Sequence, residues 1–562
     1  MTQTLVLPSS DDPVVAGAVA AIGGPPGRHA RLGQRRFWTP IRVLIALTLL
    51  TSLLGFAQKA GCRDGSTWVH EHQYTRACYT DVVALYSAEG LSSGQRPYYD
   101  HPVEYPVVIG GVMSLTARLA GNLTSLFPDA RTKAADAQLA KGGTPAAQSA
   151  KDSAQSYARG RHFYDLTWVL LTLCALVVTV TTAKLAGRRP WDAALFTLSP
   201  ALLLHATTNW DLIAMAFAGL GMLAWARRYP ALAGVLLGLA TATKLYPLLF
   251  LVPLFFLCLR ARQLRAWGLA AAMTLAVAVG VTAPIYLTSP SFVEQTKVLS
   301  SPLDRISAEG LSALLPRRTV YSYQPSATTA VTYTLTPKVV NGTVVSAPVK
   351  ATNAVYRFFE LNQTRGADWD SLYLQLQHLH RSKGPLKAVG NPIASFFTDT
   401  TVPPKRLNLV VGLLEVLAMG GVGVLILRVR RRPRLPQVLF LSLTAFLLLN
   451  KVDSPQYVLW LVPLAALARP RWRPFLAWQA AEALVLLARF YFFVGNDKPG
   501  EGISIGLFFA AVLLRDLLLL VFAAFVVRDI VRPELDAVRA DGADDPAGGV
   551  LDGVPDRQPA YA

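Results

Sequence analysis

Long apolar runs separated by short polar breaks dominate the sequence. A run of roughly 17–25 apolar residues is long enough to cross the hydrocarbon core of a bilayer as a helix. Apolar runs predict membrane-spanning helices over residues 41–58, 164–184, 191–206, 210–226, 230–243, 246–259, 267–287, 408–428, 436–449, 456–468, 475–494 and 503–527. The pattern therefore predicts an all-α polytopic membrane protein whose bundle has about 12 spans.

One apolar run does not count as a span. Residues 107–119 are apolar, but the run is short and Arg118 interrupts it. A full crossing here would also reverse the orientation of every later span. We expect this segment to re-enter the membrane or to lie along its surface.

Polar segments divide the chain into modules. We expect a disordered basic N-terminus over 1–40, an N-terminal membrane module over 41–287, and C-terminal membrane helices over 406–528. Within the first module, 59–106 form the first outer loop, and the low-complexity residues 121–161 form a mobile insertion. Residues 288–405 form a large, partly folded outer loop with a strand-like run over 329–335. An acidic tail rich in Gly, Pro and Ala, 529–562, is expected to be disordered.

Charged residues are scarce, at 16% of the chain, compared with roughly 25% in soluble domains. The net charge of +19 comes from Arg and Lys beside the predicted spans, at 188–189, 227–228, 260–265, 428–434 and 469–473. This positive-inside pattern places those ends and both termini in the cytoplasm, and the 59–106 and 288–405 loops outside. Because no basic face alternates with exposed aromatics, nucleic-acid binding is not expected.

The first outer loop carries the densest set of acids, histidines and tyrosines. Asp81 precedes a short apolar run, at a membrane–water boundary where partial desolvation raises the pKa of a carboxylate and suits it to act as a general base. The structural alternative is a helix N-cap, a role open to both Thr80 and Asp81. Glu104 and Tyr105 precede Pro106, at the mouth of the 107–119 segment, where a simple N-terminal charge is the alternative.

Polar residues at three later helix junctions are expected on the same face. Asn209 and Asp211 flank an interfacial Trp and are either a second acidic site or a helix start. Lys244 lies between two apolar runs, where it must snorkel or meet an anion such as phosphate. Lys451, Gln456 and Tyr457 belong to a polar break at 450–457. Their convergence from several helix ends is the arrangement expected of an outward-facing active site.

The remaining candidate chemistry is limited. Cys62 and Cys78 both lie in the first outer loop and form a disulfide candidate if that loop faces an oxidising exterior; two free thiols are the alternative. His378 and His380 lack further ligands at convincing spacing, so no metal site is expected. The chain also lacks P-loop and HExxH motifs, and we expect no nucleotide-binding domain.

Four stretches in this order resemble the actinobacterial membrane glycosyltransferases of the GT-C superfamily, specifically glycosyltransferase family 87. They are CYTDVVALYSAEGL with PVEYPVV, GRRPWDAAL through TNWDLIAMA, TATKLYPLLFLVPL, and NKVDSPQYVLWLVPL. The resemblance implies a GT-C-type transmembrane bundle and an inverting transferase. Such an enzyme moves mannose or another hexose from a polyprenyl-phosphate donor to a hydroxyl of a cell-envelope glycan or glycolipid. Beyond this lipid-linked donor, no cofactor is implied.

By the same resemblance, Asp81 matches the general base of these enzymes and Lys244 the lysine that holds the donor phosphate. Lys451, Gln456 and Tyr457 would line the same cavity, on the outer face of the cell membrane. The alternative is a polytopic transporter or a lipid or glycolipid flippase, which predicts inverted repeats and mid-membrane ionisable residues. A structural envelope protein would leave these polar positions scattered.

Overall fold

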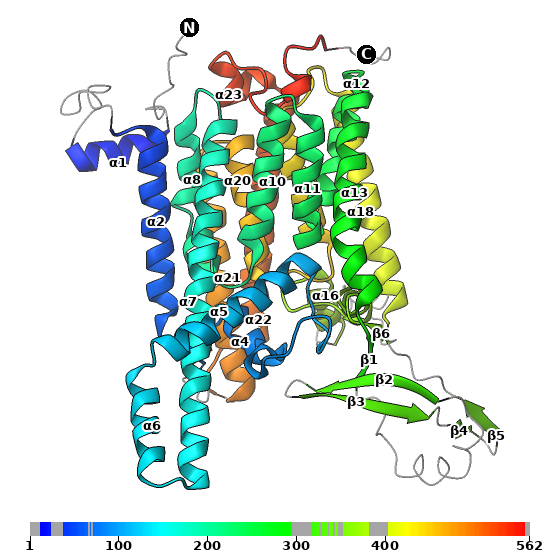
Figure 1. Cartoon of the computed structure of the whole chain (residues 1–562). Coiled ribbons are helices and arrows are strands. Elements are labelled where there is room, and N and C mark those ends of the chain that lie inside the picture. The colour runs from blue at the N-terminus through cyan, green and yellow to red at the C-terminus, as the bar shows by residue number, and fades with distance from the viewer. Residues whose placement is uncertain are drawn as a thin grey trace.

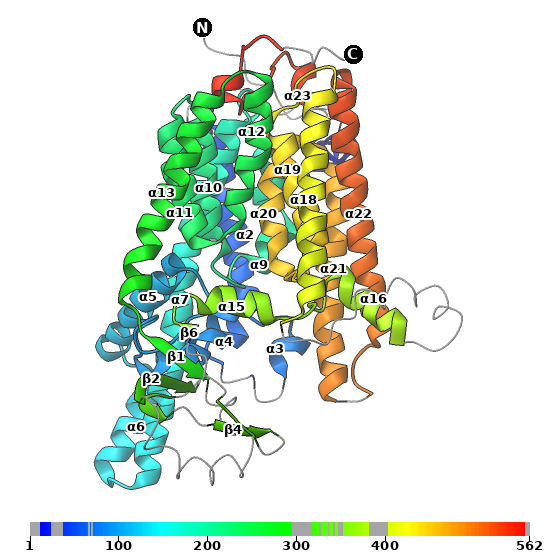
Figure 2. The same cartoon turned by 90° about the vertical axis from the view of Figure 1, so that its right-hand side faces the viewer.

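Long helices run alongside one another through most of the molecule (Figure 1, Figure 2). The computed structural model describes residues 12–23, 37–65, 68, 71–294, 317–324, 327–334, 337–340, 343–346, 352–381, 403–498 and 500–556. Within these ranges, seven helices are long and apolar enough to cross a membrane. They are α2 (Pro40–Lys59), α5 (Val107–Leu126), α7 (Pro145–Leu185), α13 (Leu264–Thr288), α18 (Lys405–Arg428), α21 (Trp472–Asp497) and α22 (Ile505–Val531).

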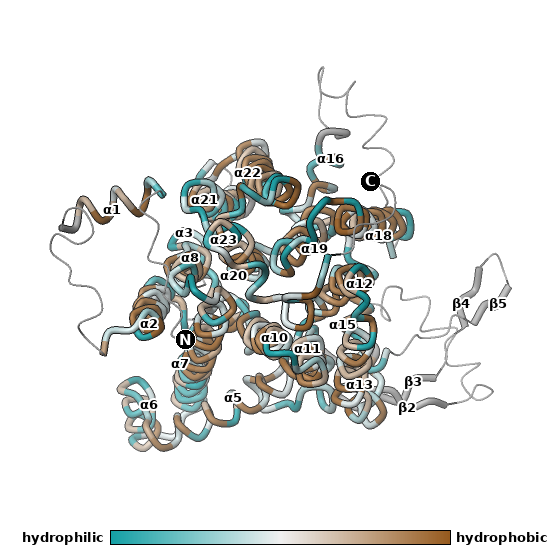
Figure 3. Tube along the Cα trace, turned by 90° about the horizontal axis from the view of Figure 1, so that it is seen from above, coloured by the Kyte–Doolittle hydropathy of each residue, from teal (hydrophilic) through white to brown (hydrophobic). Residues whose placement is uncertain are grey.

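Five shorter apolar stretches lie among these helices, as the view from above shows (Figure 3). They are α10 (Asp211–Ala226), α11 (Pro230–Thr243), η5 (Tyr246–Phe250) with α12 (Leu251–Arg260), α19 (Leu435–Leu449), and η7 (Pro455–Tyr457) with α20 (Val458–Ala468). A helical multi-pass membrane protein is confirmed by these elements, whereas the number of about 12 crossings stays a prediction.

Small residues bring neighbouring helices into close contact. On α11, Gly234 and Gly238 face α13, and a Cβ atom on Gly238 would lie 2.7 Å from the Thr274 carbonyl oxygen. The Thr274 hydroxyl donates to the Gly234 carbonyl at 3.2 Å. Helices α2 and α7 are joined similarly, by a 2.7 Å hydrogen bond between Thr48 and Thr179. Close backbone approach and interhelical hydroxyl bonds are the usual means of helix packing where lipid removes the hydrophobic driving force.

The span predicted over 191–206 is not one continuous helix, because three short helices occupy this region. They are η4 (Pro190–Ala193), α8 (Ala194–Thr197) and α9 (Pro200–His205). Pro200 has no amide hydrogen to continue α8. The Ser199 hydroxyl instead accepts a hydrogen bond from the Leu202 amide at 3.1 Å and caps α9. After α9, residues 206–210 lie next to the first outer loop, where the Thr207 and Thr208 carbonyls accept from Thr80 and Asp81.

The apolar segment after the first outer loop forms one helix, α5, which continues to Leu126 rather than ending at 119. Its composition would allow a crossing. In Figure 1 and Figure 3, however, α5 runs across its neighbours at the lower end of the bundle rather than along them. It contacts α7, α11 and α13 there. Whether α5 crosses the membrane, re-enters it or lies along its surface stays a prediction.

A helical hairpin occupies most of the insertion predicted over 121–161. It consists of α6 (Ala130–Lys141) and the first turns of α7, and it projects beyond the bundle (Figure 1). Asp129 caps α6 by accepting from the Thr132 amide at 2.8 Å. Low-complexity composition did not reveal these helices, although Ala and Lys favour helix formation. The mobility of the hairpin stays a prediction.

Short strands follow α13, in the region expected to be a partly folded outer loop. A four-stranded sheet has the order β3-β2-β1-β6, with β1 parallel to β2; β4 and β5 pair antiparallel. The strand-like run at 329–335 is confirmed as part of β3, and residue 335 lies outside the described residues. The bounds are β1 (Ser291–Glu294), β2 (Arg317–Gln324), β3 (Ala327–Thr334), β4 (Pro337–Val340), β5 (Thr343–Ser346) and β6 (Thr352–Asn353), followed by α15 (Arg357–Thr364) and α16 (Leu372–Arg381).

The acidic segment after α22 is folded, so the prediction of a disordered tail over 529–562 is wrong for residues up to 556. This segment contains η8 (Pro533–Leu535), α23 (Ala537–Ala540) and η9 (Gly549–Leu551). It packs on the arginine-bearing ends of earlier helices: Asp536 pairs with Arg434 at 2.7 Å and Asp556 with Arg260 at 2.8 Å. Composition alone suggested disorder because the segment has little apolar surface to bury. The ion pairs with arginines far along the chain supply the missing contacts. Residues 557–562 lie outside the described residues.

The N-terminus was also expected to be disordered up to residue 40, yet residues 13–23 form α1 (Pro13–Gly23). The carboxylate of Asp12 accepts a hydrogen bond from the Trp472 amide at 3.1 Å. Helix α1 lies at the same end of the bundle as α23 (Figure 1). Residues 1–11 and 24–36 lie outside the described residues.

The first outer loop lies at the opposite end of the bundle from α23 (Figure 1). The helices in its described residues are short, namely η1 (Ala60–Cys62), α3 (His72–Thr75), α4 (Asp81–Ala88) and η3 (Leu91–Ser93). The polar residues singled out by the sequence are therefore carried by loops and helix ends at one end of a rigid apolar bundle.

Candidate active site

Asp81 is the first residue of α4, and the preceding residue caps the helix. The Thr80 hydroxyl accepts from the Val82 amide at 3.2 Å and donates to the Thr207 carbonyl at 2.6 Å. The Asp81 backbone amide donates to the Thr208 carbonyl at 2.8 Å. Because Thr80 serves as the N-cap, the Asp81 side chain is not used for capping. The α9–α10 junction thus fixes the start of α4 and leaves the Asp81 carboxylate available for another role.

Asn209 connects Asp81 to Tyr105. Its amide nitrogen donates to the Asp81 carboxylate at 2.8 Å and to the Tyr105 hydroxyl at 2.6 Å. Its amide oxygen accepts from the Trp210 backbone at 2.7 Å, which fixes the orientation of the side chain. Tyr79 supplies a second hydrogen bond to the Asp81 carboxylate. Two donors therefore hold one carboxylate in a defined position.

The environment of Asp81 acts on its proton affinity in two directions. Burial raises the pKa of the Asp81 carboxyl, and it is the largest effect. The hydrogen bonds from Asn209 and Tyr79 and the charge of Lys244 lower this pKa, while the charge of Asp211 raises it. The net result is a pKa above the ordinary value for aspartate. A carboxylate whose basicity is raised by burial and which is held in place by donors is suited to proton abstraction.

A cavity of about 630 Å³ opens beside this carboxylate. Loops and helix ends from the whole length of the chain contribute to its walls, which are both polar and aromatic. Seven of the residues predicted from the sequence line it, and these are Asp81, Glu104, Tyr105, Asn209, Lys244, Gln456 and Tyr457. The predicted convergence of polar helix ends is therefore present in the structure.

Lys244 sits in this cavity within an aromatic surround. Its ammonium group lies 5.8 Å from the ring centre of Tyr105, 5.6 Å from that of Tyr457 and 5.7 Å from that of Trp460. Behind it, the Asp211 carboxylate is 2.7 Å away. Aromatic rings and a carboxylate at these distances offset part of the cost of burying an ammonium group.

Asp211 is fully buried beneath the cavity rather than part of its lining. It accepts from the Trp460 indole at 2.7 Å as well as pairing with Lys244. The Trp460 ring in turn stacks between Tyr246 and Tyr457, with 4.2 Å between ring centres on each side. Asp211 therefore positions the lysine and the aromatic wall and does not face the space a substrate would occupy.

Lys451 was expected to line the cavity, but its side chain points elsewhere. Its ammonium group donates to the Arg365 carbonyl at 2.6 Å and to the Asn408 side chain at 2.5 Å. Burial lowers the pKa of Lys451 to about 8. Both acceptors are neutral and belong to other segments, so the Lys451 ammonium group links these segments to its own loop. Lys451 thus holds the segment that bears Arg365 against the bundle.

Sequence patterns missed several cavity residues. Arg365 lines the cavity from the loop after α15, and its guanidinium lies 3.8 Å from the Glu104 carboxylate. Arg489 lines it from α21 and pairs with the fully buried Asp370 at 2.9 Å. An ionisable residue within an apolar run is itself a signal of function, so Arg489 could have been found in the sequence. Arg365 gave no comparable signal, because it stands in an ordinary polar loop.

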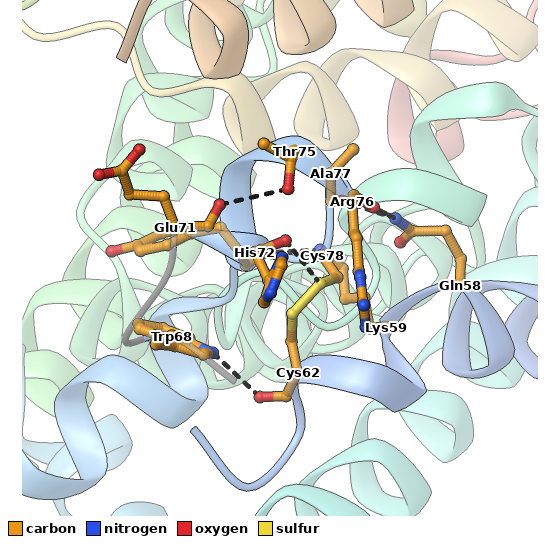
Figure 4. The surroundings of a disulfide bond; sticks show 11 residues. Gln58, Lys59, Cys62, Trp68, Glu71, His72, Thr75, Arg76, Ala77 and Cys78 are labelled. Atoms are coloured by element: carbon orange, nitrogen blue, oxygen red, sulfur yellow. Dashed lines mark hydrogen bonds between the residues drawn. A yellow bond between two sulfur atoms is a disulfide. The ribbon is translucent and has the colours of Figure 1, made fainter. Parts of the chain in front are cut away.

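The predicted disulfide is present and closes the first outer loop (Figure 4). Cys62 and Cys78 are buried, and their Cα atoms are 5.8 Å apart. Around the bond, the Trp68 indole donates to the Cys62 carbonyl at 3.1 Å and the Gln58 side chain donates to the Ala77 carbonyl at 2.6 Å. Cys78 lies two residues before the Thr80 cap. The disulfide therefore restrains the backbone that leads into Asp81.

Comparison with protein families identifies part of the chain. The model of glycosyltransferase family 87 matches residues 158–351. The match covers residues 158–351 of a chain of 562 residues, so this part of the chain is similar to the family. The matched segment includes Asn209, Asp211 and Lys244, whereas Asp81 and the 450–457 turn lie outside it. No curated protein matches the chain at a significant level. Family 87 indicates a membrane glycosyltransferase, in agreement with the resemblance seen in the sequence.

Proposed function

We propose that this protein is a glycosyltransferase of family 87 that transfers a hexose, such as mannose, from a polyprenyl-phosphate donor to a hydroxyl group of a cell-envelope glycan or glycolipid. The observation that carries the proposal is a single cavity lined by a held carboxylate, Asp81, and by the cations Lys244 and Arg365. A carboxylate can accept the proton of the attacking hydroxyl. Cations stabilise a departing phosphate. The apolar walls of the surrounding bundle suit the lipid part of such a donor.

The transfer proceeds by one displacement at the anomeric carbon. The acceptor oxygen forms a bond to this carbon as the bond from the carbon to the phosphate oxygen breaks. The hydroxyl proton passes to Asp81, and the polyprenyl phosphate leaves with the electron pair of the broken bond. Attack and departure on opposite faces invert the anomeric configuration. Lys244 faces the negative charge that develops on the phosphate oxygen.

The active site is proposed to face the outside of the cell membrane. Arginine-rich helix ends lie at the end of the bundle that carries α23, and Asp81 lies at the other end. Positively charged loops remain in the cytoplasm during membrane insertion. The cavity would then open toward lipid-linked sugars and acceptors of the outer leaflet.

Transfer of radiolabelled sugar by the purified protein in lipid tests this function. The assay offers polyprenyl-phosphate hexoses as donors and extracted envelope glycolipids as acceptors. We expect transfer by the wild type and a loss of about 10²–10⁴-fold for Asp81→Asn, the range of general-base contributions. The matched control is Asp100→Asn, because Asp100 lies in the same outer loop but pairs with the exposed Arg96 at 2.8 Å. We expect the control to retain its activity.

Two outcomes would contradict the proposal at different points. Full activity in folded Asp81→Asn would move the base elsewhere, and Glu104, the other lining carboxylate of the loop, would be tested next. An inactive wild type, with every donor, would refute the transferase. The transporter or flippase alternative would then be tested by movement of lipid-linked sugar across liposome membranes.

A further inference from the structure

A second, smaller cavity lies behind the first, and Asp81 belongs to both. Its volume is about 150 Å³. The wall between the two cavities is formed by residues that line each of them, among them Tyr79, Asp81, Gln456 and Arg489. The carboxylate therefore stands at a boundary, with a large space on one side and a small one on the other.

The two cavities differ in charge. Lys244 and Arg365 line the large cavity but are not among the described residues that line the small one. Arg489 borders the small cavity, but the buried Asp370 carboxylate lies 2.9 Å from it. A phosphate would consequently be held in the large cavity. Apart from Asp81 and the paired Arg489, the polar residues that line the small cavity carry hydroxyl, amide or imidazole groups.

The lining of the small cavity combines hydroxyl-binding groups with aromatic rings. His205 and Thr208 come from the α9–α10 junction, and their side chains lie 3.5 Å apart. Tyr74 of α3 packs against Phe490 of α21, with 5.7 Å between the ring centres. A sugar ring presents hydroxyl groups at its edge and C–H groups on its faces. Polar groups beside aromatic surfaces suit both.

We propose that the small cavity is the acceptor subsite and that it takes one pyranose ring of the acceptor. This inference rests on the transferase function proposed above. In an inverting displacement, the attacking oxygen and the leaving phosphate lie on opposite sides of the anomeric carbon. If the phosphate is at Lys244, the attacking hydroxyl approaches from a space that Asp81 borders and Lys244 does not, and among the described residues the lining of the small cavity meets both conditions. An apolar cavity of about 150 Å³ admits a six-membered ring such as benzene, so this space fits one sugar ring whose substituents extend into the large cavity.

The step that joins the cavities is the transfer already described. One hydroxyl oxygen of the bound pyranose forms the new bond to the anomeric carbon, and its proton passes to Asp81. The donor sugar and its phosphate stay in the large cavity until the old bond breaks. No further reactant is required.

Filling the small cavity tests the inference. Leu486 lines only the small cavity among the described residues and is 4% exposed. Leu486→Trp would place an indole where the pyranose ring is expected. The matched control is Leu487→Trp, because Leu487 is the next residue on α21 and is 46% exposed on its outer surface. The assay measures the KM for acceptor and for donor separately, with methyl hexopyranosides as soluble acceptor probes.

We expect Leu486→Trp to raise the acceptor KM at least tenfold and to leave the donor KM unchanged, while Leu487→Trp alters neither. Thr208→Val is the second variant, because it preserves side-chain shape and removes only the hydroxyl. We expect it to raise the acceptor KM about tenfold, as for the loss of one hydrogen bond. If Leu486→Trp fails to fold, the acceptor KM of Thr208→Val alone tests whether the small cavity binds the acceptor.

Two results would overturn the subsite, and they are distinguishable from failure of the function. An active wild type whose acceptor KM is unchanged in the folded variants would show that the acceptor binds elsewhere. A rise in the donor KM instead would assign the small cavity to the donor sugar. Absence of transfer by the wild type with every donor would refute the transferase itself, and the subsite with it.

Discussion

Replacing Asn209 by leucine should shift the acidic limb of the pH–activity profile. Asn209 donates to the Asp81 carboxylate at 2.8 Å, and this bond lowers the pKa of Asp81 against the opposing effect of burial. A general base must be ionised to accept a proton, so activity falls as pH drops through its pKa. Asn209→Leu removes a donor that stabilises the ionised form. The pKa of Asp81 therefore rises further, and activity is lost at a higher pH than in the wild type.

The size of this shift follows from the geometry of the bond. Hydrogen bonds to charged groups contribute about 1.5–3 kcal/mol, and one pKa unit corresponds to about 1.36 kcal/mol. Loss of the amide donor should thus raise the pKa by about 1 to 2 units. The lower end is expected because Tyr79 also donates to the carboxylate and stays in place.

The measurement is kcat/KM for the lipid-linked donor between about pH 5 and 9, with acceptor saturating. Tyr105→Phe is the matched comparison. It removes the other partner of the Asn209 amide at 2.6 Å and leaves the bond to Asp81 intact. We expect only a small shift for this variant. An acidic limb that stays in place or moves to lower pH in folded Asn209→Leu would refute Asp81 as the titrating base.

Three further predictions concern charge and covalent structure. Lys244→Met should destabilise the fold by about 3–5 kcal/mol, because it leaves the buried Asp211 without its cation; adding Asp211→Asn should restore the melting temperature in detergent but not sugar transfer. Replacing Cys62 and Cys78 together by serine should cost about 3 kcal/mol for a loop of this length, and an unchanged melting temperature would contradict this. Asp536→Asn should lower the melting temperature, because it removes the charged partner of the buried Arg434; an unchanged melting temperature would contradict a stabilising role for this ion pair.

Polar breaks between apolar runs located much of the candidate site. Asp81, Asn209 and Lys244 each stand at one end of an apolar run, and in a helical bundle such ends gather at the membrane surfaces. The alternation of basic clusters then assigned these breaks to a common end. Hydropathy and charge thus predicted which residues share a cavity, without information on which atoms touch.

Side-chain direction was beyond the reach of the sequence. Lys451 and Gln456 belong to the same polar break, yet only Gln456 faces the cavity, while Lys451 is held by the Arg365 carbonyl and Asn408. The pairing of Asp211 with Lys244 likewise depends on two helix ends that meet only in the folded bundle. Local sequence patterns indicate where helices end. They do not indicate which residues a side chain will bind, and these partners decide whether the side chain faces the cavity.

The folded C-terminal segment has a consequence for the assembly of the protein. Arginines at helix ends direct each span as it enters the membrane, and their charges must be free to do so. The aspartates that later pair with Arg434 and Arg260 are synthesised after the last span. These topogenic charges are therefore neutralised only when the final helix is in place. A chain whose synthesis has not reached this segment therefore exposes Arg434 and Arg260 without these partners. Its cytoplasmic surface is more basic than that of the finished protein.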